Sequence, residues 1–416
     1  MPDPLVPAAV RAAVPAHRDG NVLRWVGAYT ASMLRDTVFY LALSWAAVQR
    51  GSAAEAGVVT AVSAVPRALL MLGGGVVVDR LGPRRAVIGS DAVRCAAVLA
   101  VAVLLFATDP GLWLLALLAL VFGAVDALFL PAVGALPARI TAKDQLARVQ
   151  GMRGLAVRFA AVVGAPLGGL GVAVGGSAAA FALAGLLIAV SVPLLVCVRM
   201  RELPADDAVA AEGGTAWRDL RDGLSYVRRH RVLGPLMLVI ALGDLGFVGP
   251  LNVGLTLLAD ERGWGASGMG WVLAGFGAGA GAAALLLTVR GRVPRAGYVV
   301  AGALVPGAAA IGALAQAPAL PAAVGTALLI GLLAGLSGAL CGALLQTQAD
   351  PGHLGRVTAV AGIVSLGIAP LSMPLSAAAI GVWGTGPVFA ASAAVCGLGG
   401  VVALCAPGVR RAELPK

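Results

Sequence analysis

The chain has 416 residues, of which 59% are hydrophobic and 12% are charged, and its mean hydropathy is +0.93. A soluble protein of this length could not bury so much apolar surface, so this composition excludes a soluble globular protein and indicates a lipid environment. In lipid the backbone polar groups need internal partners, which leaves only helices and closed barrels. The apolar runs are continuous rather than alternating, and they therefore predict an all-α integral membrane protein.

Apolar segments that are long enough to cross a bilayer recur along the chain. A helix needs about 20 apolar residues to span the bilayer core. Residues 296–349 and 357–409 contain no Asp, Glu, Lys or Arg, and each stretch is long enough for two such helices. The whole chain gives about twelve predicted spans. They cover residues 22–47, 55–78, 85–107, 112–137, 152–174, 178–198, 232–257, 267–289, 297–315, 321–346, 356–381 and 386–407.

The lysines and arginines are distributed asymmetrically among the predicted loops. Alternate loops contain only Arg50 and Arg262, whereas the tails, the central loop and the remaining loops contain most of the others. Because basic loops stay in the cytoplasm, both termini and the central loop are predicted to be cytoplasmic. The abundance of Ala and Gly indicates a GC-rich bacterial genome, so the expected location is a bacterial cytoplasmic membrane. The net charge of +10 is attributed to this topology and to anionic lipids, not to nucleic-acid binding.

An internal repeat divides the chain into two similar halves. Shifting the sequence by 208 residues, half of its length, aligns several uncommon residue types. A single offset across six spans predicts two parallel six-helix bundles, the architecture of transporters that rock about a central site. The matches include Asp36 with Asp244, Gly123 with Gly331, Arg148-Val149 with Arg356-Val357, and Pro166-Leu167 with Pro374-Leu375.

The spans and the repeat together predict the domain organisation. Apolar residues recur at helical spacing in Trp217–Arg229, which predicts an amphipathic helix along the membrane surface or under the bundle. The predicted segments are a disordered cytoplasmic tail at 1–21, a first six-helix bundle at 22–198, a cytoplasmic linker with the amphipathic helix at 199–231, a second bundle at 232–407 and a cytoplasmic tail at 408–416.

A short motif lies between the second and third predicted spans. Residues 75–85 read Gly-Val-Val-Val-Asp-Arg-Leu-Gly-Pro-Arg-Arg. This sequence resembles the G-x-x-x-D-R-x-G-R-[RK] signature of the major facilitator superfamily, with Pro83 moving the basic pair one position along. The resemblance implies twelve transmembrane helices in two pseudo-symmetric six-helix bundles, and a loop that acts as a latch between conformations; the alternative is a turn that only sets topology. The latch residues would be Gly75, Asp79, Arg80, Gly82, Arg84 and Arg85.

Other stretches resemble the exporter branch of this superfamily that includes macrolide efflux pumps and the enterobactin exporter. They are Ala31–Asp36, Pro66-Arg67, Ser90–Arg94 and Asp126–Ala132. The fifth span also contains a sequence similar to the G-P-x-x-G-G core of the family's antiporter motif, with Ala165 in place of the first glycine. Close packing and bending of this helix explain the motif without any substrate contact. The motif residues are Gly164, Pro166, Gly168 and Gly169.

Acidic residues inside the spans are the candidates for energy coupling. A carboxylate in lipid must face a cavity, be paired or be protonated, and burial disfavours its charged form, which permits reversible protonation. Asp36 in the first span and Asp126 in the fourth are the leading proton-coupling candidates, and Asp244 in the seventh is the third. For each of them the alternative is a satisfied, structural pair that holds helices together.

Two further observations concern the charged partners of these acids. Asp91 stands three residues before Arg94, a helical spacing that predicts a structural ion pair. Arg67 and Arg158 also lie within spans and are candidate counter-ions.

The sequence gives no sign of an enzyme, a cofactor or a metal site. The cysteines lie in apolar spans at unrelated spacings, and the histidines lie in tails or loops without a partner at ligand spacing. The glycine-rich run Gly275–Gly281 has no preceding strand and no following Lys-Ser/Thr, so it predicts helix-packing seams rather than a nucleotide loop.

The predicted function is export of hydrophobic or amphipathic small molecules by proton antiport through alternating access, as in multidrug resistance. Carriers of sugars need hydrogen-bonding amides, yet asparagine occurs only at Asn21 and Asn252. The alternatives are an uptake permease for a small metabolite and a membrane sensor that does not transport. The expected partners are a small-molecule substrate, protons and membrane lipids, and the chain is expected to be a monomer.

Overall fold

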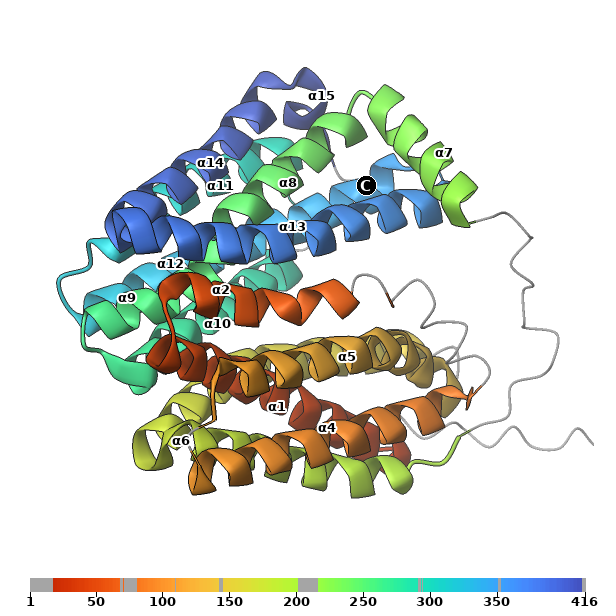
Figure 1. Ribbon diagram of the computed structural model, residues 1–416. Helices are drawn as coiled ribbons and strands as arrows, with labels where there is room; N and C mark the ends of the chain where they lie inside the picture. Colours follow the sequence, from red (N-terminus) through yellow and green to blue (C-terminus); the bar gives the residue numbers. More distant parts are fainter. Residues whose placement is uncertain are drawn as a thin grey trace, which may run out of the picture.

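The computed structural model describes residues 18–67, 70, 81–108, 110–141, 145–200, 216–290, 293, 295–350 and 353–413. Every regular element among them is a helix, and the helices form two bundles (Figure 1). The first bundle contains α1 (Gly20–Arg50), α2 (Ala53–Val62), α4 (Pro83–Ala107), α5 (Leu112–Ile140) and α6 (Leu146–Val196). The second contains α8 (Leu233–Gly249), η3 (Pro250–Gly254), α9 (Leu255–Glu261), α10 (Gly265–Arg290), α11 (Ala296–Ala315), α12 (Leu320–Gln348), α13 (Leu354–Trp383) and α14 (Thr385–Cys405). α7 (Ala216–Arg229) precedes the second bundle, and α15 (Pro407–Arg410) follows it.

These elements make twelve membrane spans. In the described residues, 8 helices are long and apolar enough to cross a membrane by length and composition. One of them, α6, crosses twice, because its helical geometry breaks at Gly175 and Gly176. At Gly176 the backbone has φ +67°, a region that favours glycine, and the chain reverses there. α8, η3 and α9 form one span with a π-helical turn in the middle. α1, α13, and α2 with the helical turn at 64–67 lie at the positions of the remaining predicted spans, so the all-α, twelve-helix prediction is confirmed.

Helix packing repeats between the bundles. Gly123 of α5 lies so close to the end of α2 that an added Cβ would overlap the carbonyl group of Ser63. Its counterpart at the 208-residue offset, Gly331 of α12, lies equally close to the carbonyl group of Phe276 in α10. Small residues let two helix backbones approach in this way. The same close contact, between the second and fourth spans of each half, therefore occurs twice.

The bundles meet at one end of the molecule. The six turns after α1, α4, the first part of α6, α9, α11 and α13 all lie at this end, which we call the short-turn side (left in Figure 1). Ser44 of α1 hydrogen-bonds Thr256 of α9 at 2.7 Å, and the Gln49 amide donates to Asp260 at 2.8 Å. α6 also packs on α10, and α2 on α13. The bundles are thus joined on the short-turn side.

The amphipathic helix predicted in the linker is α7, which lies at the opposite end of the second bundle, the α7 side. It packs on α13 and α8 through the buried Val227. The Tyr226 hydroxyl donates to the Asp350 carboxylate at 2.8 Å, and the Tyr226 ring stacks on His353 with centroids 4.3 Å apart. The helix is therefore attached to the bundle by both polar and aromatic contacts.

Candidate functional site

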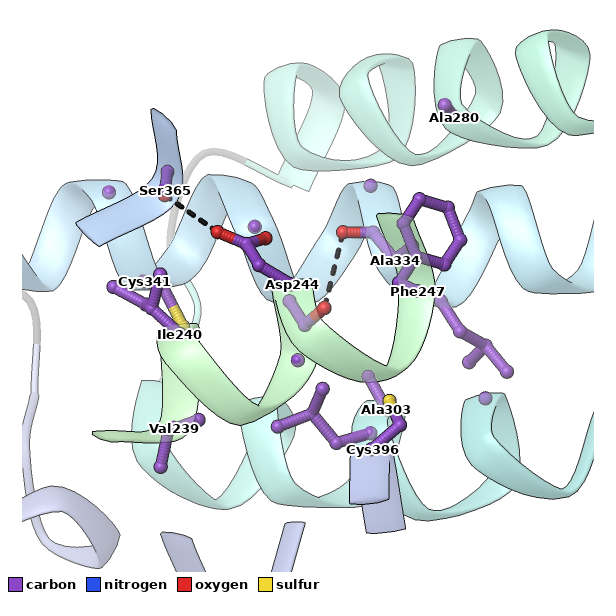
Figure 2. Close-up of a pocket in the computed structure, with 18 of the residues that line it drawn as sticks. Val239, Ile240, Asp244, Phe247, Ala280, Ala303, Ala334, Cys341, Ser365 and Cys396 are labelled. Atoms are coloured by element: carbon purple, nitrogen blue, oxygen red, sulfur yellow. Dashed lines mark hydrogen bonds between the residues drawn. The ribbon is translucent and has the colours of Figure 1, made fainter. Parts of the chain in front are cut away.

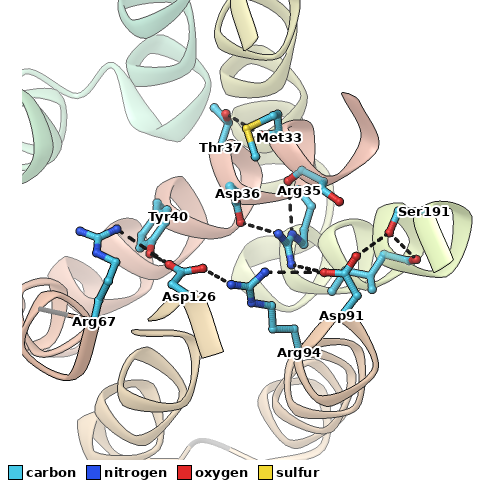
Figure 3. Close-up of polar contacts among 12 residues, drawn as sticks. Met33, Arg35, Asp36, Thr37, Tyr40, Arg67, Asp91, Arg94, Asp126 and Ser191 are labelled. Atoms are coloured by element: carbon cyan, nitrogen blue, oxygen red, sulfur yellow. Dashed lines mark hydrogen bonds and ion pairs between the residues drawn. The ribbon is translucent and has the colours of Figure 1, made fainter. Parts of the chain in front are cut away.

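A cluster of charged side chains lies inside the first bundle, where α1, α4 and α5 meet (Figure 3). We call it the charge cluster. It contains Arg35 and Asp36 of α1, Arg67 of the helical turn 64–67, Asp91 and Arg94 of α4, and Asp126 of α5. Three carboxylates thus face three guanidinium groups, so the cluster is neutral when every group is ionised. Such balance is required because an uncompensated charge inside a membrane protein is costly.

Arg35 and Asp91 form the innermost part of the cluster. The Nη1 atom of Arg35 is 3.2 Å from Oδ1 of Asp91, and its Nη2 atom is 2.9 Å from Oδ1 of Asp36. The second carboxylate oxygen of Asp91 accepts a hydrogen bond from the Ser191 hydroxyl of α6 at 3.0 Å. The side chains of Arg35, Asp91 and Arg94 are all fully buried. This inner part joins α1, α4 and the second span of α6.

Asp126 holds the other side of the cluster. One of its oxygens is bound by Arg94, whose guanidinium also lies 4.5 Å from the Phe129 ring centroid. The other oxygen accepts a hydrogen bond from the Tyr40 hydroxyl at 3.1 Å and lies 3.8 Å from Nη1 of Arg67. Three donors from three different segments therefore converge on a single carboxylate.

The acids of the cluster differ in exposure. The side chain of Asp36 is 26% exposed, that of Asp126 is 10% exposed and that of Asp91 is 0% exposed. Among the described residues, Asp36 forms an ion pair only with Arg35. Arg35 also pairs with Asp91. Asp36 is consequently the acid with the fewest stabilising contacts and the best access.

The antiporter-like motif packs directly behind Asp36. A Cβ at Gly164 would lie 2.8 Å from Cβ of Thr37, and one at Gly168 would lie 3.2 Å from Cα of Val38. Gly169 faces the other bundle instead, where an added Cβ would lie 2.5 Å from the Ala266 carbonyl oxygen. Pro166 stands inside the same helix, α6. This segment therefore fits α6 between α1 and α10 and touches both bundles.

A cavity of about 590 Å³ lies in the second bundle (Figure 2). All six spans of that bundle line it, through α8, α10, α11, α12, α13 and α14, and Arg158 of α6 joins them from the first bundle. Its walls are mostly apolar, with Phe247 and Phe276 among them. The charged residues among its described lining are Asp244 and Arg158.

Asp244 lies on the cavity wall, where its carboxylate accepts one hydrogen bond. The Ser365 hydroxyl of α13 donates to its Oδ2 atom at 2.6 Å, and Asp244 is only partly buried. No basic side chain of the described residues lies within ion-pair distance of this carboxylate. The Cys341 and Cys396 thiols line the same cavity.

The structure groups the predicted site residues differently from the sequence. Asp36 and Asp126 share the charge cluster, whereas Asp244, the repeat partner of Asp36, lies in the cavity of the other bundle. Nη1 of Arg94 lies 3.6 Å from Oδ1 of Asp91, but each of these residues also contacts other members of the cluster. Of the two candidate counter-ions, Arg67 lies beside Asp126 and Arg158 lies on the cavity wall.

Only part of the predicted latch can be placed. Gly75, Asp79 and Arg80 lie outside the described residues. Gly82 has φ +82° and precedes α4, and Pro83 occupies the first turn of that helix. The Arg84 guanidinium donates to the carbonyl oxygen of Val196 at the end of α6, and Arg85 is exposed.

Several residues of these sites had no role assigned from the sequence. Arg35 had a visible signal, because it is a basic residue inside an apolar span. Tyr40 and Ser365 had none, since a hydroxyl within a span usually bonds its own helix, as Thr37 does with the Met33 carbonyl. Their roles depend on the hydrogen bonds that they make to carboxylates on neighbouring helices.

A family model described as the Major Facilitator Superfamily matches residues 25–370. The chain belongs to this superfamily. Over 398 residues it is 26% identical to proteins named "Multidrug efflux pump Tap" from Mycobacterium tuberculosis and Mycobacterium bovis, and the match covers 91% of this chain and 91% of each relative. The prediction of a superfamily transporter similar to drug exporters is thereby confirmed.

Solved transporter structures share the fold of this superfamily member. The nucleoside transporter NupG matches with a TM-score of 0.69 at 13% identity, over 94% of this chain and 100% of the other. An auto-inhibited peptide transporter of the POT family matches with a TM-score of 0.70 at 16% identity, over 95% and 98%. At such low identity the likeness establishes the fold of a multi-pass membrane transporter and leaves the cargo open.

Proposed function

We propose that this transporter exports amphipathic small molecules by proton antiport. The observation that carries the proposal is the cavity of about 590 Å³, whose volume suits a drug-sized molecule. Its described lining contains no asparagine or glutamine, and its polar groups are few. Such walls bind an apolar body and leave the hydroxyl groups of a sugar without partners. The similarity to multidrug efflux pumps supports export as the direction.

The charge cluster is the proposed coupling site. Asp36 is the most exposed of its acids and shares Arg35 with Asp91, so it is the group we assign to proton binding. Asp126 is held by Arg94, Arg67 and Tyr40 and keeps the cluster together. Protonation of Asp36 leaves Arg35 to pair with Asp91 alone, which changes the ionic contact between α1 and α4. α1 also carries the contacts to α9 on the short-turn side, so proton binding and bundle movement share one helix.

The proposed location is a bacterial cytoplasmic membrane, with both termini and α7 in the cytoplasm. This orientation rests on the arginine and lysine distribution, because the short-turn side carries few basic residues. The hydrogen bonds between the bundles on that side then close the molecule toward the outside. The same arrangement leaves the cavity to be loaded from the cytoplasm, as export requires.

Transport in proteoliposomes with an imposed pH gradient tests this function. Wild-type protein is expected to concentrate ciprofloxacin against its gradient. Asp36→Asn should abolish the uphill, pH-driven component and retain downhill exchange, since a neutral residue at this position mimics the protonated state. Asp222→Asn, which removes an exposed acid on α7, is the matched control and should behave as wild type.

Other outcomes would assign the coupling elsewhere or refute it. If Asp126→Asn folds and loses the uphill component while Asp36→Asn keeps it, Asp126 is the proton site. If both variants still concentrate cargo in response to the pH gradient, the charge cluster is not the coupling site and Asp244 becomes the remaining candidate. Transport that does not respond to pH in the wild-type protein would refute proton antiport.

A further inference from the structure

The two charges of the cavity come from opposite bundles. Asp244 belongs to α8 in the second bundle, and Arg158 belongs to α6 in the first. All other described lining residues are uncharged. A molecule that contacts both charges at once therefore touches the two bodies that move during alternating access.

Asp244 has the properties of a group that receives a cation. Its carboxylate is partly buried on an apolar wall, and Ser365 occupies only one of its two oxygens. Among the described residues it has no basic partner, unlike the acids of the charge cluster. A carboxylate in such surroundings gains most from a positive group that arrives with the ligand, and a protonated amine supplies both charge and hydrogen bonds.

Arg158 has the complementary properties. Its side chain is exposed on α6, and no acid of the described residues lies within ion-pair distance of it. A guanidinium group presents several donors in one plane and binds a carboxylate through two parallel hydrogen bonds. The same group that would repel a purely cationic ligand therefore favours a ligand with an anionic end.

We propose that this cavity selects amphipathic zwitterions, molecules with a protonated amine and a carboxylate on a largely aromatic or aliphatic body. The amine binds Asp244, the carboxylate binds Arg158, and the apolar body lies against the walls that include Phe247 and Phe276. This inference rests on the proposed export function and specifies its cargo class. Because each end of the ligand is held by a different bundle, occupancy favours the conformation in which the bundles approach each other around the cavity.

Three related quinolones test the proposal. Ciprofloxacin has a secondary amine and a carboxylate, its methyl ester keeps only the amine, and its N-acetyl derivative keeps only the carboxylate. Binding is measured by the anisotropy of quinolone fluorescence with the protein in lipid nanodiscs and with empty nanodiscs as the blank. Wild-type protein should bind the zwitterion about tenfold more tightly than either derivative, since each derivative loses one charge-assisted contact.

Two substitutions identify the partner of each charge. Asp244→Asn retains an oxygen that can accept from Ser365 and should weaken the zwitterion and the methyl ester, but not the N-acetyl derivative. Arg158→Gln should weaken the zwitterion and the N-acetyl derivative, but not the ester. Asp222→Asn and Arg139→Gln, which alter exposed charges outside the cavity, are the matched controls.

In the expected result, called the crossed pattern, each cavity variant loses affinity only for the compounds that carry the charge it binds. This pattern tests the zwitterion site. Equal affinity of wild-type protein for all three compounds, or unchanged affinities in both cavity variants, overturns the proposal, as does an absence of binding. A protein that shows the crossed pattern but transports independently of pH keeps this cargo assignment and refutes proton antiport. A protein that exports ethidium with a pH gradient but lacks the crossed pattern keeps the proposed function and refutes the zwitterion site.

Discussion

The Ser44 hydroxyl donates a hydrogen bond of 3.3 Å to the backbone carbonyl of Asn252, a residue 208 positions further along the chain. This separation equals the offset of the internal repeat, so the two residues are equivalent positions of the two bundles. Equivalent positions that touch each other lie on the pseudo-two-fold axis between the halves. Asn252 is also part of the π-helical turn η3, a helix irregularity that is frequent at functional sites. The contact therefore marks the point about which the bundles close on the short-turn side.

Weakening this contact should open the short-turn side. Ser44→Ala combined with Thr256→Val removes a buried hydrogen bond between the bundles, worth about 1 kcal/mol, which shifts a two-state equilibrium about fivefold. Spin labels at Ala54 and Trp383, both exposed on this side, should report a larger fraction of long distances by pulsed electron paramagnetic resonance.

This measurement needs a background without the two exposed cysteines, Cys197 and Cys405. The control is Thr326→Val, because the Thr326 hydroxyl bonds only its own helix, at the Ala322 carbonyl. An unchanged distance distribution in the Ser44→Ala/Thr256→Val protein would show that these hydroxyl groups do not hold the side closed.

Two glycines of α10 should respond oppositely to alanine. At Gly279 an added Cβ would overlap the carbonyl group of Leu328 in α12, so Gly279→Ala should destabilise the protein by about 1–3 kcal/mol. At Gly281 a Cβ meets nothing within 4 Å, so Gly281→Ala should leave stability unchanged or raise it through helix propensity. Melting temperatures in detergent compare the two; equal values would refute the close packing of α10 on α12.

Removing one cation from the charge cluster should destabilise the first bundle. Arg94→Met leaves Asp126 and Asp91 without a common partner and is expected to cost about 3–5 kcal/mol. The double variant Arg94→Met/Asp126→Asn should recover part of this loss, because it removes the stranded charge as well. Thermal unfolding compares the single and the double variant with the wild-type protein, and the exposed Arg139→Met serves as control. A double variant that is less stable than Arg94→Met would contradict the ion-pair account.

The Tyr226 hydroxyl group contributes the polar part of the attachment of α7. Tyr226→Phe keeps the ring stack on His353 but removes the hydrogen bonds with the carboxylate and backbone N–H of Asp350, so amide hydrogen exchange in α7 should become several-fold faster. Tyr298→Phe, in α11, is the control and should not alter exchange in α7. Equal exchange in wild type and Tyr226→Phe would show that α7 is held by its apolar face alone.

Labelling in intact bacterial cells tests the orientation. With Cys197 and Cys405 replaced by serine, a cysteine at Ala319 on the short-turn side should react with a membrane-impermeant maleimide. A cysteine at Arg228 of α7 should react only after the membrane is permeabilised. The reverse pattern would invert the proposed topology.

The spans, the repeat and the family were predictable from the sequence because each depends on local properties. A run of apolar residues such as 297–315 must be a helix in lipid regardless of its neighbours, and α11 covers almost the same residues. The motif at 75–85 likewise carries its own signature. The turn at Gly175-Gly176 was predictable for the same reason, since glycine permits the reversal between two apolar runs.

The partners of the buried charges were decided by the tertiary structure. The i, i+3 spacing of Asp91 and Arg94 predicted a pair, but only the rotation of α1 and α5 about their axes brings in Arg35 and Asp126. Asp36 and Asp244 are equivalent in sequence, yet one faces a guanidinium on its own helix and the other faces a cavity. Spacing along one helix fixes which residues share a face, whereas what that face meets depends on packing between helices far apart in the chain.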